Sequence, residues 1–115
     1  MSNRLPGLLG DPSYVTLVAD VDGHVTGVAG AVLGRYYEKD GIYSRLAVLA
    51  VASTARGRGV GTRLVEAIER WSASRGAREV IVNSGVHRAD AHAFYRRRGY
   101  SHTGLRFIKS LDPPG

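Results

Sequence analysis

The chain has 115 residues, of which 43% are hydrophobic, and this predicts one domain over residues 1–115 with one hydrophobic core. A formal net charge of +6 favours an anionic partner. The absence of cysteine excludes disulfides, a thiol nucleophile and thiolate metal ligands. No apolar run is long enough to span a bilayer, and the N-terminus lacks the apolar segment of a signal peptide, so we expect a cytoplasmic protein.

The first half of the chain is predicted to form an antiparallel meander. Residues 1–13 are expected to be irregular, with at most one helical turn around Leu5, Leu8 and Leu9, because prolines and glycines interrupt them. Apolar and β-branched patterns predict three strands, at Tyr14–Ala19, His24–Tyr37 and Ile42–Val51. Asp22-Gly23 is typical of a hairpin turn, and residues 38–41 turn the chain a second time.

A strand, a glycine-rich loop and a helix follow one another between Leu46 and Ser74. Leu46–Val51 is a continuous apolar run, which is typical of a strand covered on both faces. The helix is predicted from the spacing of its apolar residues, Val60, Leu64, Ala67, Ile68 and Trp71. It should end near Arg75-Gly76, where glycine can adopt the left-handed cap.

The loop itself, Arg56-Gly57-Arg58-Gly59-Val60-Gly61, has the features of an anion site. Its glycines remove side chains where the chain enters the helix, so that an anion can approach unpaired N–H groups and the positive end of the helix dipole. The flanking arginines, including Arg63, add positive charge. The alternative is a tight turn that needs glycine only for its geometry. The Walker pattern does not fit, because it requires a lysine between the last glycine and the Ser/Thr, whereas here Thr62 follows Gly61 directly.

The second half of the chain is predicted to complete a mixed α/β sheet. Glu79–Asn83 should be a strand parallel to Leu46–Val51, because a helix connects the two. A short helix is expected at Ala89–Arg98 and a last strand at Thr103–Leu111, with a tail at residues 112–115.

Two motifs together resemble those of the GNAT N-acetyltransferases. The first is Arg/Gln-x-x-Gly-x-Gly/Ala at Arg56–Gly61, with a strand before it and a helix after it. The second is A-x-x-F-Y-x-x-x-G-F/Y, which is matched by Ala91, Phe94, Tyr95, Gly99 and Tyr100. The motifs occur in the right order, and the resemblance covers about residues 14–111.

The resemblance implies a single-domain α/β (α+β) fold with a mostly antiparallel sheet and a splayed parallel pair of strands at its centre. Acetyl-CoA would be the co-substrate, and its pantetheine arm would lie between the splayed strands, against the main chain of Leu49 and Val51. Its diphosphate would bind the glycine-rich segment, namely Arg56, Gly57, Arg58, Gly59, Val60, Gly61 and Thr62. Asn83 and Arg88 are further candidates for cofactor contacts, although family members often have asparagine where this chain has Arg88.

The implied reaction is direct transfer of an acetyl group to a primary amine of a small molecule or peptide. Tyr95 is the candidate general acid, because the family places a tyrosine near the CoA sulfur and the pKa of a tyrosine is close to that of a thiol. Adjacent helical residues point about 100° apart, so we expect Phe94 in the core and Tyr95 toward the cofactor. The alternative is that both are core residues.

The general base stays unassigned. Many family members use a glutamate on the strand before the glycine loop, whereas this strand holds Arg45 and no acid. Loop candidates are Glu38, Asp40 and His87, and a water chain is the alternative. No metal is expected, because the neighbouring histidines do not share a helix face.

The front of the chain departs from the family, whose full members carry a strand and two helices before the strand that begins here at Tyr14. We expect either a truncated version or a second subunit in that place, and a homodimer is favoured because a bare sheet edge invites pairing. The alternative function is a CoA-binding but inactive module or fragment that acts through dimerisation. Nucleic-acid binding is a third interpretation of the charge, although no recognised motif supports it. The acceptor amine is left open.

Overall fold

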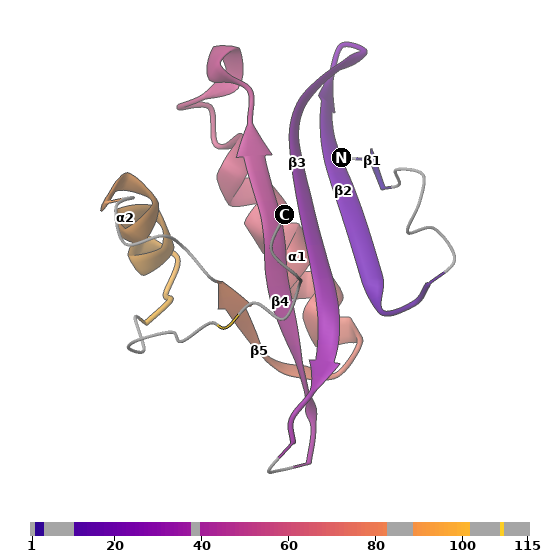
Figure 1. The fold of residues 1–115 in the computed structure, drawn as a ribbon. Helices are drawn as coiled ribbons and strands as arrows, with labels where there is room; N and C mark the ends of the chain where they lie inside the picture. Colours follow the sequence, from indigo (N-terminus) through magenta and orange to yellow (C-terminus); the bar gives the residue numbers. More distant parts are fainter. Residues whose placement is uncertain (1, 4–10, 38–39, 83–88, 102–108, 110–115) are drawn as a thin grey trace. The chain divides into compact units, whose positions relative to one another are not determined.

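The computed structural model describes residues 2–3, 11–37, 40–82, 89–101 and 109 (Figure 1). The chain forms two compact units, Met1–Asn83 and Ser84–Gly115. The first contains the sheet and the longer helix, and the second contains the shorter helix. Each unit is described by itself below.

The first unit is built on a five-stranded sheet in the order β1–β2–β3–β4–β5. The strands are β1 (Ser2–Asn3), β2 (Tyr14–Val21), β3 (His24–Arg35), β4 (Ile42–Val51) and β5 (Ala77–Val82). Successive strands from β1 to β4 pair with one another in antiparallel orientation, and β5 pairs parallel to β4. This confirms the predicted mixed sheet with one parallel pair.

The turn between β2 and β3 has the conformation that its sequence predicts. Asp22 and Gly23 have φ values of 52° and 82°, which are both left-handed. A two-residue hairpin turn of this kind matches the twist of the strands that it joins, and Asp-Gly is favoured there. The turn therefore sets the register of β2 against β3, with Val21 opposite His24.

The expectation of an irregular start was wrong at Ser2–Asn3, which forms β1 and pairs with Leu17 and Val18 of β2. A two-residue strand is too short to show an alternating pattern, so nothing in the sequence marks it. The helical turn expected around Leu5–Leu9 lies outside the described residues.

Helix α1 (Val60–Ser74) packs on one face of the sheet (Figure 1). Leu64, Val65 and Ile68 of the helix have no exposed surface. On the sheet, buried small and apolar residues face them, namely Val15, Ala19, Ala29, Ala31 and Leu46. A Cβ at Gly27 would lie 2.9 Å from Leu64 Cδ1 and 3.0 Å from Val60 Cγ1. Gly27 is therefore a point of close approach that fixes the start of α1 against β3.

The C-terminal end of α1 also agrees with the sequence. Gly76 has a φ of 84°, and the N–H of Arg75 donates to the carbonyls of Ser72 and Trp71 at 3.1 Å each. The last carbonyls of the helix are thus satisfied by a glycine-terminated cap. Before α1, a short 3₁₀ helix at Ser53–Ala55 leads out of β4.

In the described residues of the second half, the elements differ from the sequence prediction at their ends. β5 begins at Ala77 and ends at Val82, and helix α2 spans Ala89–Arg97. The strand predicted at Thr103–Leu111 and the tail at residues 112–115 fall almost entirely outside the described residues. Within the described ranges, no helix combines the length and the apolar character needed to cross a membrane.

Candidate functional site

The glycine-rich segment leads into α1 through two left-handed residues. Gly57 has a φ of 81° and Gly59 a φ of 78°, and a side chain at either position would be strained. A Cβ at Gly59 would have no heavy atom within 4 Å. The glycines are therefore required by backbone conformation, and the space beside Gly59 is open within the described part of the chain.

The start of α1 has no side-chain cap. Gly59 occupies the N-cap position, no side chain hydrogen-bonds there, and the first turn contains no acidic residue. The first intrahelical bond runs from the N–H of Arg63 to the carbonyl of Gly59 at 3.1 Å. The N–H groups of Val60, Gly61 and Thr62 thus lack intrahelical acceptors, and they carry the positive end of the helix dipole.

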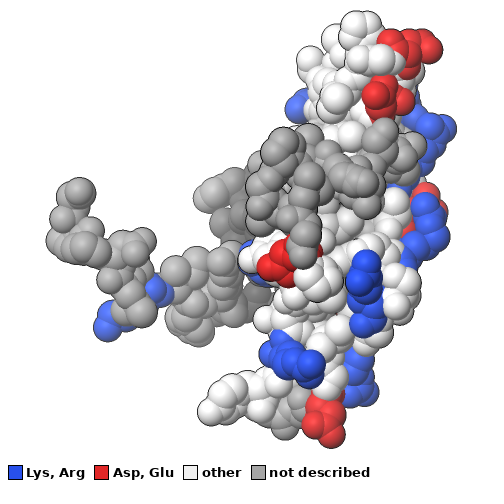
Figure 2. Space-filling view, turned by 90° about the vertical axis from the view of Figure 1, so that its right-hand side faces the viewer, with Lys and Arg blue, Asp and Glu red and all other residues white. Residues whose placement is uncertain are grey.

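Arginines surround this helix start and continue along the helix. The exposed ones are Arg56, Arg58, Arg63, Arg70 and Arg75. Figure 2 shows Lys and Arg side chains gathered along one side of the described surface, with fewer Asp and Glu among them. Bare N–H groups and exposed guanidinium groups at one place suit an anionic group of phosphate type.

The outer edge of β4 has no strand partner among the described residues near the glycine-rich segment. β5 pairs with β4 from Ile42 to Leu46, and the last pair is Leu46 with Val82. Beyond Leu46, β4 continues to Val51 and pairs only with β3 among the described strands. Val82 is the last described residue of β5, so the course of the pair beyond Leu46, and with it the predicted splay, lies outside the described residues.

The main chain of Leu49 and Val51 points toward this open edge. The N–H of Ala52 donates to the carbonyl of Thr26 at 2.8 Å, so position 52 faces the β3 side. Backbone groups alternate in direction along a strand, and Leu49 and Val51 consequently face away from β3. Their N–H and C=O groups can pair with an extended ligand that lies along the edge.

A β-bulge lies next to the last described pair of β4 and β5. Gly30 pairs with Val48 and Ala31 pairs with Leu46, which leaves Ala47 as an extra residue in β4. A bulge redirects the backbone that follows it and strengthens the local twist. The bulge could not be predicted from the sequence, because Ala47 lies inside a continuous apolar run that carries no bulge signal.

We call these features together the β4–α1 site and define it as Leu49, Val51 and residues 56–62. β4 runs toward the loop that contains the glycines, so the open edge and the start of α1 lie at the same end of the sheet (Figure 1). Val60 is buried and anchors the helix, whereas Gly61 and Thr62 are half-buried. The remaining cofactor candidates, Asn83 and Arg88, lie outside the described residues.

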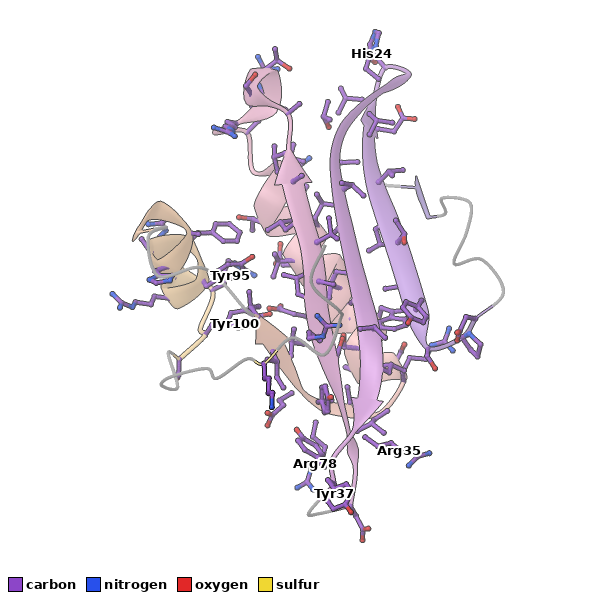
Figure 3. The ribbon with its side chains drawn as sticks, in the orientation of Figure 1. His24, Arg35, Tyr37, Arg78, Tyr95 and Tyr100 are labelled. Atoms are coloured by element: carbon purple, nitrogen blue, oxygen red, sulfur yellow. The ribbon has the colours of Figure 1, made fainter. Side chains whose placement is uncertain are left out.

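Tyr95 belongs to the second unit, where it lies in an aromatic cluster on α2 (Figure 3). Its ring makes edge-type contacts with Phe94, at a centroid distance of 5.2 Å, and with Tyr100, at 5.6 Å. Phe94 and Tyr95 are both half-buried. Phe94 is therefore not fully buried, although the helix geometry had led us to expect that it would be. The contacts hold the Tyr95 ring from two sides.

Asp40 lies at the other end of β4 from the β4–α1 site. It lies before β4, at the end of the sheet that carries Tyr37 and Arg78, and its carbonyl accepts a hydrogen bond from Arg78 Nη1 at 3.1 Å (Figure 3). β4 separates it from Val51 by about 30 Å at a rise of roughly 3.3 Å per residue. The other two candidates, Glu38 and His87, lie outside the described residues. The described part of the chain holds no group of three or more acidic or histidine residues that could bind a metal ion.

The family model described as "Acetyltransferase (GNAT) family" matches residues 2–100, and the chain therefore belongs to this acetyltransferase family. It is 32% identical over 105 residues to an IAA acetyltransferase of Azospirillum brasilense, which covers 90% of this chain. It is 28% identical over 101 residues to an aminoalkylphosphonate N-acetyltransferase of Salmonella typhimurium, which covers 88% of this chain. The chain spans 66% of the length of each of these relatives.

The fold is shared with solved members of the family. An aminoglycoside N-acetyltransferase in complex with CoA superimposes with a TM-score of 0.81 at 21% identity. The similar region covers 88% of this chain and 78% of that one. At this level of identity the comparison establishes the common fold.

Proposed function

We propose that this protein is an N-acetyltransferase that transfers an acetyl group from acetyl-CoA to a primary amine of a small molecule. The observation that carries the proposal is the β4–α1 site, where an uncapped helix start preceded by left-handed glycines lies at the same end of the sheet as the part of β4 that has no second strand partner among the described residues. An acyl-CoA has the matching parts, a diphosphate joined to an extended amide-containing arm. Family membership and the small-molecule acetyltransferases among its relatives support the same activity.

In this proposal the two halves of the site bind different parts of acetyl-CoA. The N–H groups at the start of α1 bind the diphosphate, with Arg56 and Arg58 adding charge. The amides of the pantetheine arm pair with the main chain of Leu49 and Val51 on the open edge of β4. Asn83 and Arg88 supply additional contacts.

The chemistry that follows is a direct transfer. The amine nitrogen attacks the thioester carbon, the C–S bond breaks, and the departing thiolate takes a proton from the hydroxyl of Tyr95. A main-chain N–H on the unpartnered edge of β4 polarises the thioester carbonyl. The proton lost by the amine leaves through water, because the described part of β4 offers no acid.

The activity is tested by release of free thiol from acetyl-CoA in the presence of a panel of primary amines. We expect thiol release that depends on both the protein and an amine. Tight binding of acetyl-CoA without thiol release for any amine would contradict the enzyme and support the alternative of an inactive CoA-binding module.

We also propose that the protein is a homodimer. β1 pairs with only two residues of β2, so most of the outer edge of β2 has no strand partner among the described residues. Such an edge readily pairs with another chain. Light scattering on the purified protein should give twice the chain mass, and a monomer mass at micromolar concentration would contradict the dimer.

A further inference from the structure

The side chain of Arg45 projects from the face of the sheet opposite α1. Its neighbours in β4, Ser44 and Leu46, are buried on the face that α1 covers, whereas Arg45 between them is exposed. Side chains alternate between the two faces of a strand, so this pattern fixes the direction of Arg45. It is the only charged residue of β4.

The surroundings of Arg45 on this face are uncharged in the middle strands. By register, its cross-strand neighbours are Val32 on β3 and Ile81 on β5. The next side chains of β4 on the same face are Tyr43 on one side and Val48 on the other. An arginine among apolar neighbours is less screened than one among other charges and attracts an anion more strongly.

No carboxylate of the described residues neutralises Arg45. Within the described ranges it has no hydrogen-bond or ion-pair partner. The acidic residue of β5, Glu79, lies near Tyr36 instead: burial, and then Glu79, raise the pKa of that tyrosine above its usual value.

Arg45 also lies just past the reactive end of the proposed acetyl-CoA position. The phosphate end of the site is at the start of α1, and the arm runs back along Val51 and Leu49 toward the point where β5 closes the edge. That point is Leu46, next to the bulge at Ala47. Arg45 is about 7 Å from Ala47 along the strand. A small amine acceptor is long enough to span this distance.

We propose that Arg45 binds an anionic group of the acceptor, and that the acceptor is a primary amine carrying a carboxylate, phosphate or phosphonate a few bonds from the nitrogen. The guanidinium can donate two parallel hydrogen bonds to such an oxyanion. This contact would orient the amine toward the thioester carbon. The inference rests on the proposed acetyltransferase activity and specifies its substrate class.

The test compares acceptors that differ only in the anionic group. One pair is 3-aminopropionate and 3-aminopropan-1-ol, and the other is 2-aminoethyl phosphate and 2-aminoethanol. For the unaltered protein we expect kcat/KM to be at least about 10-fold higher for the anionic member of one or both pairs. Which pair shows the larger preference identifies the anion as carboxylate or phosphate.

Substitution of Arg45 separates its contribution from the general charge of the protein. Arg45→Gln should lower kcat/KM for the anionic acceptor by about 10- to 100-fold, with little effect on the neutral acceptor or on the KM of acetyl-CoA. The matched control is Arg35→Gln, which removes an exposed arginine at the far end of β3 (Figure 3). This control should leave the preference unchanged.

Two results would overturn the inference while the acetyltransferase activity stands. One is equal turnover of the anionic and neutral acceptors by the unaltered protein. The other is an equal loss on both acceptors in Arg45→Gln. If no amine is turned over, the proposed activity fails. The role of Arg45 is then decided by calorimetric binding of the same acceptor pairs in the presence of CoA. Unchanged binding of the anionic acceptor in Arg45→Gln would contradict the proposed contact with Arg45.

Discussion

Gly59→Val is expected to lower the affinity for acetyl-CoA by at least about 100-fold while the protein stays folded. The new side chain would enter the open space beside the start of α1, where the proposed diphosphate lies. It would therefore block access to the bare N–H groups of the first helical turn. Isothermal titration calorimetry with acetyl-CoA measures the loss directly.

The backbone strain of this substitution needs a matched control, because Gly59 has a φ of 78°. Gly76→Val supplies it: Gly76 has a φ of 84°, it also has no atom within 4 Å of a Cβ, and it lies at the opposite end of α1. Both variants should lose stability by roughly 1–3 kcal/mol, as expected for a β-branched residue in the left-handed region. Equal acetyl-CoA affinity in the two variants would refute the assignment of the diphosphate to the start of α1.

Tyr95→Phe is expected to reduce turnover by about 100- to 10,000-fold, the usual contribution of a general acid. The change removes only the hydroxyl and keeps the ring between Phe94 and Tyr100. The KM of acetyl-CoA should therefore stay within about 3-fold of its original value, since the binding contacts lie elsewhere. Steady-state kinetics with a saturating amine gives both parameters.

The control for this prediction is Tyr100→Phe, which removes a hydroxyl from the ring that packs against Tyr95. It should change turnover by less than about 5-fold, because its hydroxyl has no part in the proposed reaction. Comparable losses in the two variants would point to disturbed packing of α2. Unchanged turnover in Tyr95→Phe would remove this residue from the mechanism.

The local elements of this fold could be predicted from the sequence because each is specified by neighbouring residues. β4 has the predicted bounds, since an apolar run begins after Gly41 and ends before the Ala52–Arg56 segment. α1 begins and ends where its glycines allow left-handed conformations, at Gly59 and Gly76. The helix packs closely on β3 at Gly27, where a Cβ would lie 2.9 Å from Leu64 Cδ1.

The features that could not be predicted depend on partners distant in the sequence. Ser2–Asn3 is a strand only because β2 offers it an edge. The bulge at Ala47 arises from the register of β4 on β3, and the continuous apolar run conceals it. The distance between Asp40 and the glycine-rich segment likewise follows from the length of β4, which the spacing in the loop does not reveal.

The central claim is that the β4–α1 site binds acetyl-CoA, and a thermal shift measurement with three ligands tests it most directly. At about 100 times its dissociation constant, a ligand stabilises the folded protein by about 2.7 kcal/mol, which raises the melting temperature of a small domain by several degrees. The account predicts such a shift with acetyl-CoA and with CoA, and none with ATP at the same concentration. Absence of a shift with acetyl-CoA and CoA would contradict it.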